Sequence, residues 1–233
     1  MWFFDPTLLL FVIPPLLLGL WAQARVRSAY QRASRIRSRR GITGVETART
    51  LLEAEGVNGI RIEPTPGMLS DHYHPLQRKL ALSEQVYGDD SLAAVGVAAH
   101  EAGHAIQHAR RYVPMYLRTA LVPLTQFGSM LGQVALGIGI LLVFMGLVLG
   151  KWILLAGIIG YAIVFLFTLV TLPVEFNASK RARVALVEHG LIDRDEMPEV
   201  KGVLDAAALT YVASTVSVLG ALLQMLFVYN RAR

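Results

Sequence analysis

Two histidines four residues apart, with a glutamate beside the first, form the most chemically informative motif of the chain. On a helix, His100 and His104 would lie on one face about one turn apart, so both imidazoles can bind one Zn²⁺ at ~2.0–2.1 Å. Glu101 would project beside them, placed to take a proton from water at the metal rather than to bind the metal. The motif therefore predicts a catalytic zinc site that hydrolyses peptide bonds.

Small residues surround this motif. Val97–Ala99 precede it, and Ala102, Gly103 and Ala105 lie within or beside it, which permits close packing around buried polar groups. Three ionisable side chains in so apolar a helix would be costly without a shared purpose. The alternative interpretation is a pair of hydrogen-bonded core histidines and a salt-bridged glutamate.

A catalytic zinc site needs a third protein ligand. His108 continues the same helix face, but three consecutive turns span ~12 Å, so one zinc cannot easily bind all three histidines. Glu175 is the better candidate, because a carboxylate so close to an apolar stretch needs a partner. Pro173 is expected to start the helix that carries Glu175.

The composition predicts a membrane protein. Hydrophobic residues make up 54% of the 233 residues and charged residues 17%, which is more apolar than a typical soluble domain. The chain has no cysteine, which excludes disulfides and thiolate metal sites, so His, Asp or Glu must hold any metal.

Four stretches are long and apolar enough to be candidate membrane spans: Pro6–Ala24, Leu121–Leu149, Trp152–Leu172 and Ala206–Asn230. The first has Asp5 in place of a basic region, so we expect a retained anchor rather than a signal peptide, kinked or split at Pro14-Pro15. The fourth is the most polar and either spans the membrane or packs as a long helix against the others.

Seven arginines lie between residues 25 and 40, and no acidic residue follows them until Glu46. A nucleic-acid-binding patch is one interpretation, but no nucleic-acid motif or interleaved aromatic residues accompany the arginines. The favoured interpretation is the positively charged cytoplasmic flank of a membrane helix. It places residues from 25 onward in the cytoplasm and the N-terminus outside, and it predicts no nucleic-acid partner.

Only Gly150-Lys151 separates the second and third stretches, which predicts an antiparallel hairpin turning at these residues. Two crossings return the chain to its starting side. Residues 174–202 should therefore share a compartment with residues 25–114, and Glu175 can meet the two histidines.

The region between the first and second stretches has its own predicted elements. Thr43 and Glu46 have capping-box spacing and predict a helix that ends at Gly56. Asp89–Ser91 predicts the start of a second helix, from Leu92 to about Arg110, which carries the histidine motif.

A small sheet is predicted in the same region. Ile60–Glu63 alternates like a strand and should stop at Pro64, with Lys79–Ser83 as its partner. Lys79–Ser83 is also a candidate edge strand for pairing with an extended substrate. We expect Asp71–Pro75 between them to be a loop.

The predicted fold is a mainly α membrane protein with three to four transmembrane helices and a small α+β zincin-like cytoplasmic catalytic module. Five segments are predicted: 1–24, an N-terminal anchor; 25–114, the catalytic region; 115–173, a transmembrane hairpin; 174–202, a cytoplasmic helix with the third ligand; and 203–233, a C-terminal hydrophobic helix.

Several motifs together resemble a known family: Asp71–Tyr73, Ala99–His108, Leu172–Ser179 and Ala206–Ala213. They resemble the YugP-like family of neutral zinc metallopeptidases of bacterial membranes, over nearly the whole chain. That family is similar in plan to the membrane gluzincins of the HtpX and CAAX-protease type. The resemblance implies His100, His104 and Glu175 as zinc ligands and Glu101 as the catalytic base.

One position departs from the gluzincin plan. Many gluzincins place Asp four residues after the ligand Glu, to orient a zinc-binding histidine, and here that position is Ser179. A hydroxyl can hydrogen-bond but supplies no charge. The candidates for residues that orient the ligands are His108, Asn177 and Ser179.

Further candidates are His72, Tyr73 and Tyr211, which are expected to stabilise the oxyanion or contact substrate. The alternatives are a simple loop turn for the first two and interhelical packing for Tyr211.

The predicted function is a membrane-embedded zinc endopeptidase of the cell membrane, with one Zn²⁺ per chain, active on membrane proteins or peptides at the cytoplasmic face. One alternative is a catalytically silent scaffold or adaptor with a structural zinc site, which would have no need of Glu101. A second is a metal transporter, which should carry acids or histidines within its spans.

Overall fold

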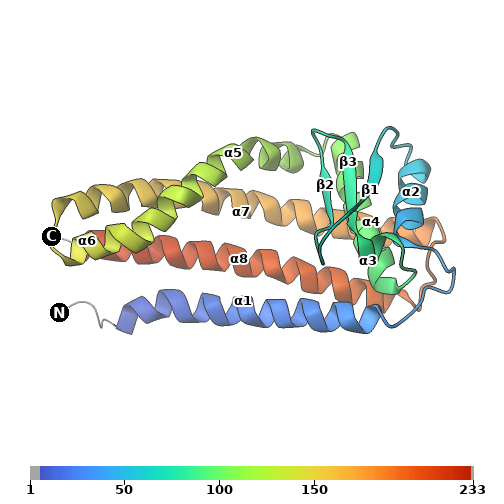
Figure 1. The fold of residues 1–233 in the computed structure, drawn as a ribbon, viewed down its shortest axis with the longest axis horizontal. Helices are drawn as coiled ribbons and strands as arrows, with labels where there is room; N and C mark the ends of the chain where they lie inside the picture. Colours follow the sequence, from blue (N-terminus) through green and yellow to red (C-terminus); the bar gives the residue numbers. More distant parts are fainter. Residues whose placement is uncertain (1–5, 232–233) are drawn as a thin grey trace. The chain divides into compact units, whose positions relative to one another are not determined.

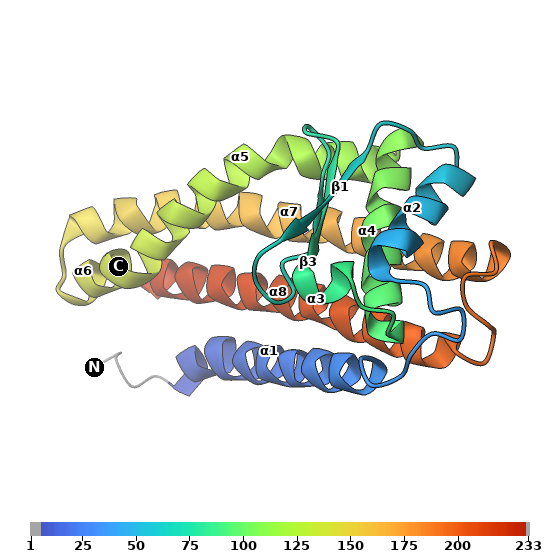
Figure 2. The ribbon, with the colours of Figure 1, turned by 45° about the vertical axis from the view of Figure 1, so that its right-hand side comes forward.

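The protein is described here by a computed structural model, which covers residues 6–231, with side chains from residue 9 onward. Residues 1–5, including Asp5, and residues 232–233 lie outside the described part. Figures 1 and 2 show the elements in chain order: α1 (Pro6–Ala33), α2 (Gly44–Ala54), β1 (Arg61–Thr65), β2 (His72–His74), β3 (Lys79–Ser83), α3 (Glu84–Tyr87), α4 (Leu92–Ala109), α5 (Val113–Val134), the π-helical η1 (Ala135–Gly139), α6 (Ile140–Phe144), α7 (Val148–Glu188) and α8 (Met197–Arg231).

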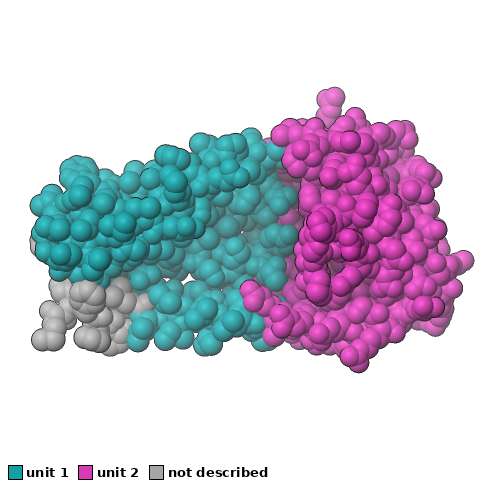
Figure 3. Space-filling model, viewed as in Figure 1, with its two compact units in different colours: residues 1–22, 117–172, 210–233 teal, residues 23–116, 173–209 magenta. Residues whose placement is uncertain are grey.

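The chain divides into two compact units, coloured separately in Figure 3. Unit 1 comprises Met1–Ala22, Leu117–Leu172 and Thr210–Arg233. Unit 2 comprises Gln23–Tyr116 and Pro173–Leu209, and contains the sheet and α4. The assignment of segments to membrane and cytoplasm stays a prediction.

Four helical segments are long and apolar enough to cross a membrane: Leu9–Ala33, Val113–Phe144, Val148–Glu188 and Met197–Arg231. The last includes the stretch whose role the sequence left open, and its mean hydropathy of 1.8 exceeds the 1.6 of the first. By length and composition, α8 therefore qualifies as a span like the others.

The helix reversal in unit 1 lies earlier than predicted. Gly146, with φ +75°, ends α6, and its N–H donates to the Val143 carbonyl while the Leu147 N–H donates to the Leu142 carbonyl. This is the Schellman arrangement, which glycine favours because it has no Cβ to clash. The predicted turn at Gly150-Lys151 is wrong, since both residues lie within the first turns of α7.

Contrary to the prediction, proline does not interrupt the long helices. Pro14 and Pro15 lie inside α1, which is not split, and Pro173 lies inside α7 rather than at the start of a new helix. A proline removes one backbone hydrogen bond, and the bonds on either side of it can still hold a long helix together. As a result, Glu175 is carried by the same helix as the apolar stretch before it.

In unit 2, the predicted capping box of α2 is present. The Glu46 carboxylate accepts the Thr43 N–H at 2.9 Å and the Thr43 hydroxyl accepts the Glu46 N–H at 3.4 Å. The helix ends before Gly56, as predicted, and packs against α4 through Leu51 and Leu52.

The sheet has the order β1-β3-β2, with β3 parallel to β1 and antiparallel to β2. The predicted pairing of the first and last strands is confirmed, but β1 continues through Pro64, which an edge strand tolerates. The expected loop around Tyr73 contains β2. Because β2 covers the other side of β3, Lys79–Ser83 is a central strand, and the prediction that it is an edge for substrate is wrong.

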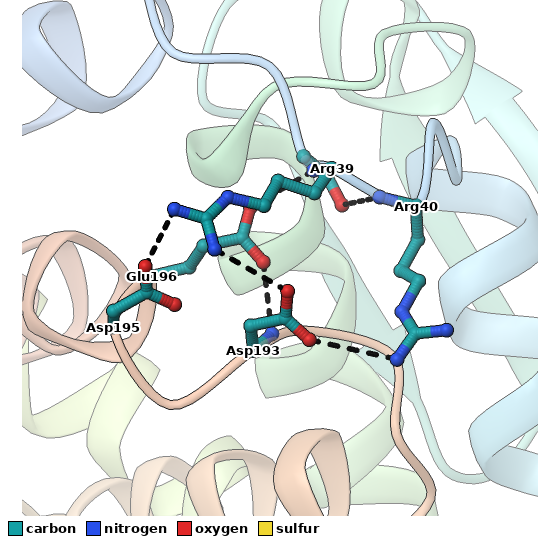
Figure 4. Close-up of polar contacts among 6 residues, drawn as sticks. Arg39, Arg40, Asp193, Asp195 and Glu196 are labelled. Carbon is teal, nitrogen blue, oxygen red and sulfur yellow. Dashed lines mark hydrogen bonds and ion pairs between the residues drawn. The ribbon is translucent and has the colours of Figure 1, made fainter.

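A buried carboxylate joins the segment after α1 to the connection between α7 and α8 (Figure 4). Glu196 is 6% exposed and accepts the backbone N–H groups of Arg39, at 2.9 Å, and Asp193, at 2.8 Å. Exposed ion pairs surround it, with Arg39 bound to Asp195 at 2.5 Å and Arg40 to Asp193 at 3.5 Å. Exposed pairs contribute little, so Glu196 should provide most of this connection's stability.

Replacing Glu196 with alanine should lower the free energy of unfolding by about 2 kcal/mol, because two backbone amides lose their acceptor. Replacing Asp195 with alanine removes an exposed ion pair and should cost about 0–1 kcal/mol. Thermal denaturation of both variants in detergent makes the comparison, and equal midpoints would contradict the role assigned to Glu196.

Candidate metal centre

The structure brings together the three predicted ligands, all within unit 2. The candidate ligand atoms of His100, His104 and Glu175 lie within 4.8 Å of one another. The Glu175 Oε2 atom is 3.2 Å from His100 Nε2 and 3.5 Å from His104 Nε2. Ligands at 2.0–2.1 Å in a tetrahedron are roughly 3.3 Å apart, so both separations match the edges of a tetrahedral zinc site.

α4 and α7 approach closely beside this cluster. A Cβ atom at Gly103 would lie 2.8 Å from the Ala178 carbonyl oxygen, which is too close for any side chain without a shift of the backbone. The glycine inside the histidine motif therefore sets the distance at which Glu175 reaches the two histidines. At its start, α4 is capped by the Ser91 hydroxyl, which accepts the Ala94 N–H at 3.2 Å.

A buried glutamine that the sequence analysis did not single out orients His104. The side-chain amide of Gln107 donates from Nε2 to the Val174 carbonyl at 2.8 Å and to Asn177 Oδ1 at 3.0 Å. Its Oε1 therefore faces His104 Nδ1, at 3.0 Å, and accepts the proton on that nitrogen. This contact leaves the Nε2 lone pair of His104 directed at the candidate metal position.

His100 has a different partner. The Ser179 hydroxyl lies 3.1 Å from His100 Nδ1, on the opposite side of the ring from Glu175. Ser179 thus occupies the position where the gluzincin plan has a carboxylate. Asn177 does not touch either histidine in the contacts described; its Oδ1 accepts from Gln107 and, at 2.8 Å, from Arg181 Nε. A neutral hydroxyl and a neutral amide therefore face the two Nδ1 atoms.

Glu101 is buried beside the cluster, with 8% of its surface exposed. Burial raises the pKa of Glu101 to about 7, while His100 lowers it and the carboxylates of Glu175 and Asp71 raise it. A carboxyl group with a pKa near neutrality can both accept and donate a proton at neutral pH. This property is required of a residue that acts first as a base and then as an acid.

The remaining predicted residues lie elsewhere. His108 is bound through Nδ1 to the Tyr73 hydroxyl at 2.8 Å, so its contacts are with Tyr73 rather than with the three-residue cluster. His72 is exposed and contacts the Ser70 carbonyl at 2.8 Å, yet it is near enough to influence the pKa of Glu101. Tyr211 belongs to unit 1, and its role stays a prediction.

Comparison with known proteins identifies the family of the chain. Residues 8–230 match the sequence model of a family described as "Putative neutral zinc metallopeptidase". The chain is 41% identical over 217 residues to the "Putative membrane protease YugP" of Bacillus subtilis (strain 168), covering 93% of each chain. No solved structure matches the chain significantly. With a match across nearly its whole length, the chain belongs to this family, as its motifs predicted.

Proposed function

We propose that the protein is a membrane-embedded, zinc-dependent endopeptidase that hydrolyses peptide bonds at the cytoplasmic face of the cell membrane. The observation that carries the proposal is the meeting of His100, His104 and Glu175 next to the buried carboxyl group of Glu101. A purely structural zinc site would have no use for a fourth ionisable side chain held at this position against the cost of burial.

Two imidazole nitrogens and one carboxylate are a donor set of catalytic zinc sites, which leave one position open. When bound, one Zn²⁺ per chain would supply the Lewis acidity that lowers the pKa of a water molecule to about 7 and polarises a carbonyl group. Gln107 and Ser179 hold the two rings so that Nε2 of each faces the metal position. Glu175 completes the set from α7.

Glu101 moves the proton. As general base it takes a proton from the attacking water, and as general acid it gives that proton to the amine that leaves. Burial raises the pKa of Glu101, which favours the uptake of a proton, and the charge of a bound Zn²⁺ would lower it, which favours its release. We also propose that substrate or the oxyanion contacts His72, Tyr73 and Tyr211. Of the first two, His72 is exposed and Tyr73 is buried.

Replacing Glu101 with glutamine should leave zinc bound and reduce peptide cleavage by about 10²–10⁴-fold, because the amide cannot carry the proton. Zinc content is measured on the purified protein, and cleavage on an unfolded substrate. Glu175→Ala is the matched control for the metal: it should lower zinc occupancy as well as cleavage. Full activity in Glu101→Gln would refute the mechanism, and normal zinc content in Glu175→Ala would place the third ligand elsewhere.

Replacing Gln107 with leucine should weaken zinc binding about 10–100-fold, because His104 loses the group that orients its ring. Competition with a zinc chelator measures this directly, independently of activity. Ser179→Ala offers the parallel test for His100. If Gln107→Leu binds zinc as tightly as the parent protein, then the amide only fills space between α4 and α7.

The cytoplasmic location is proposed from the charge pattern. Seven arginines follow the apolar part of α1 between residues 25 and 40, as expected for a cytoplasmic flank. If all four candidate helices cross the membrane, this flank predicts that the turn between α6 and α7 lies outside the cell and that unit 2 lies in the cytoplasm. Membrane proteins or peptides that reach this face are the proposed substrates.

The absence of cysteine allows this topology to be tested with single-cysteine variants. Leu147→Cys, in the exposed turn before α7, should react with a membrane-impermeant maleimide in intact cells. Gln77→Cys, exposed between β2 and β3, should react only in inverted vesicles. The reverse labelling pattern would put the metal centre outside the cytoplasm.

A further inference from the structure

Beside the end of α4, unit 2 contains a cavity of about 330 Å³ that the proposed chemistry does not use. Arg78 and Arg111 line it together with His108, Tyr73 and Tyr116, and we call it the arginine cavity. None of the lining residues in the described part of the chain is acidic. A hollow with two guanidinium groups and no carboxylate of its own is suited to an anionic group.

Arg78 and the three aromatic rings of this cavity make specific contacts. Arg78 Nη2 donates to the Asn58 carbonyl at 2.7 Å, which still leaves other N–H groups of the guanidinium for a ligand. The His108 ring lies between the rings of Tyr73 and Tyr116, with centroids 5.9 Å and 5.5 Å away. The Tyr73 hydroxyl and His108 Nδ1 are hydrogen-bonded at 2.8 Å. These three rings form an aromatic wall of the cavity.

Both arginines have a positive φ, a backbone conformation that favours glycine over residues with a side chain. Arg111, the second residue after the end of α4, has φ +53°, and its N–H donates to the His108 carbonyl. The same position after α2, α6 and α7 is taken by Gly56, Gly146 and Gly190. Glycine is the residue that suits this position, so an arginine there costs stability.

Arg78 repeats this pattern in the turn between β2 and β3. Its φ is +48°, in the left-handed region where hairpin turns usually have glycine or asparagine. Strained residues of this kind tend to gather at functional sites. Two arginines that are both strained and both line one cavity indicate that their side chains are kept for binding rather than for folding.

The arginine cavity lies along the same helix as the metal centre. His108, which lines it, is one turn beyond His104, or ~6 Å along the axis of α4, and two turns beyond Glu101, or ~10 Å. An extended peptide advances about 3.3 Å per residue. A group in the cavity would therefore belong to a substrate residue two or three positions from the bond that is cut.

We propose that the arginine cavity binds a carboxylate of the peptide substrate, two or three residues from the scissile bond. The carboxylate belongs either to an Asp or Glu side chain or to the substrate's C-terminus, and it is bound by the guanidinium groups of Arg78 and Arg111 against the wall of rings. This inference rests on the proposed peptidase function and adds a substrate class to it.

Binding of three N-acetylated, unlabelled peptides to the full-length Glu101→Gln protein in detergent, measured by titration calorimetry, tests the inference. The peptides share one sequence of Ala and Leu: one is amidated and without acid, one has a free C-terminal carboxylate, and one is amidated with a Glu near its end. At least one carboxylate peptide should bind about tenfold more tightly than the neutral one. The two carboxylate peptides distinguish terminal from side-chain recognition.

Added to this protein, Arg78→Gln and Arg111→Gly should each abolish the preference for carboxylate. Arg61→Gln is the matched control: Arg61 is exposed on β1, outside the lining, and its loss removes the same charge. Arg111→Gly should also keep or raise the thermal midpoint, because glycine relieves the backbone. A lower midpoint would contradict the argument from strain.

Equal binding of the three peptides, or a preference that survives Arg78→Gln, would overturn the inference. So would arginine-dependent binding of anionic phospholipid vesicles without any peptide preference. Because binding is measured without cleavage, the two proposals fail separately. Carboxylate preference in a protein that cleaves no peptide would refute only the peptidase, and cleavage without preference would refute only the arginine cavity.

Discussion

The close approach of α4 to α7 at Gly103 is the constraint on which the rest of the site depends. The backbone of α7 lies so near that a Cβ at Gly103 would meet the Ala178 carbonyl at 2.8 Å. This closeness lets Glu175, which is 2% exposed, reach both histidines across the helix interface. It also lets Gln107 donate to the Val174 carbonyl from the other helix. One glycine thus sets the distance between groups on two helices, such as His100 and Glu175, which are 75 residues apart in sequence.

A buried polar group without a hydrogen bond costs ~1–3 kcal/mol. The Nδ1 atoms of the two histidines both have partners, and both partners are neutral: the amide of Gln107 and the hydroxyl of Ser179. A carboxylate in either position would add another negative charge close to Glu175 and Glu101. Since nearby carboxylates raise the pKa of Glu101 further above its present value of about 7, a neutral network keeps that residue able to ionise near neutrality.

Local patterns predicted what depends on a few adjacent residues. The spacing of His100 and His104, the capping box of Thr43 and the end of α2 at Gly56 are determined within one or two helical turns. Gln107 was missed because two of its partners, Val174 and Asn177, are on α7, although its place three residues after His104 puts it on the neighbouring helix surface. The unbroken course of α7 through Pro173 and the short strand β2 depend on distant packing and pairing. Hydropathy carries no information about the course of α7 or about β2. It also placed the turn between α6 and α7 too late, because Gly146 lies inside an apolar run.

The three parts of α4 make different demands on the sequence. Its first turn needs only a cap, which Ser91 provides, and its middle needs small residues and the metal-binding side chains. Its end is where stability and function oppose each other, because Arg111 stands at the position that glycine fills after α2, α6 and α7. A stability optimum would place glycine there as well. The arginine is therefore best explained by what its guanidinium can bind, about two helical turns beyond His104.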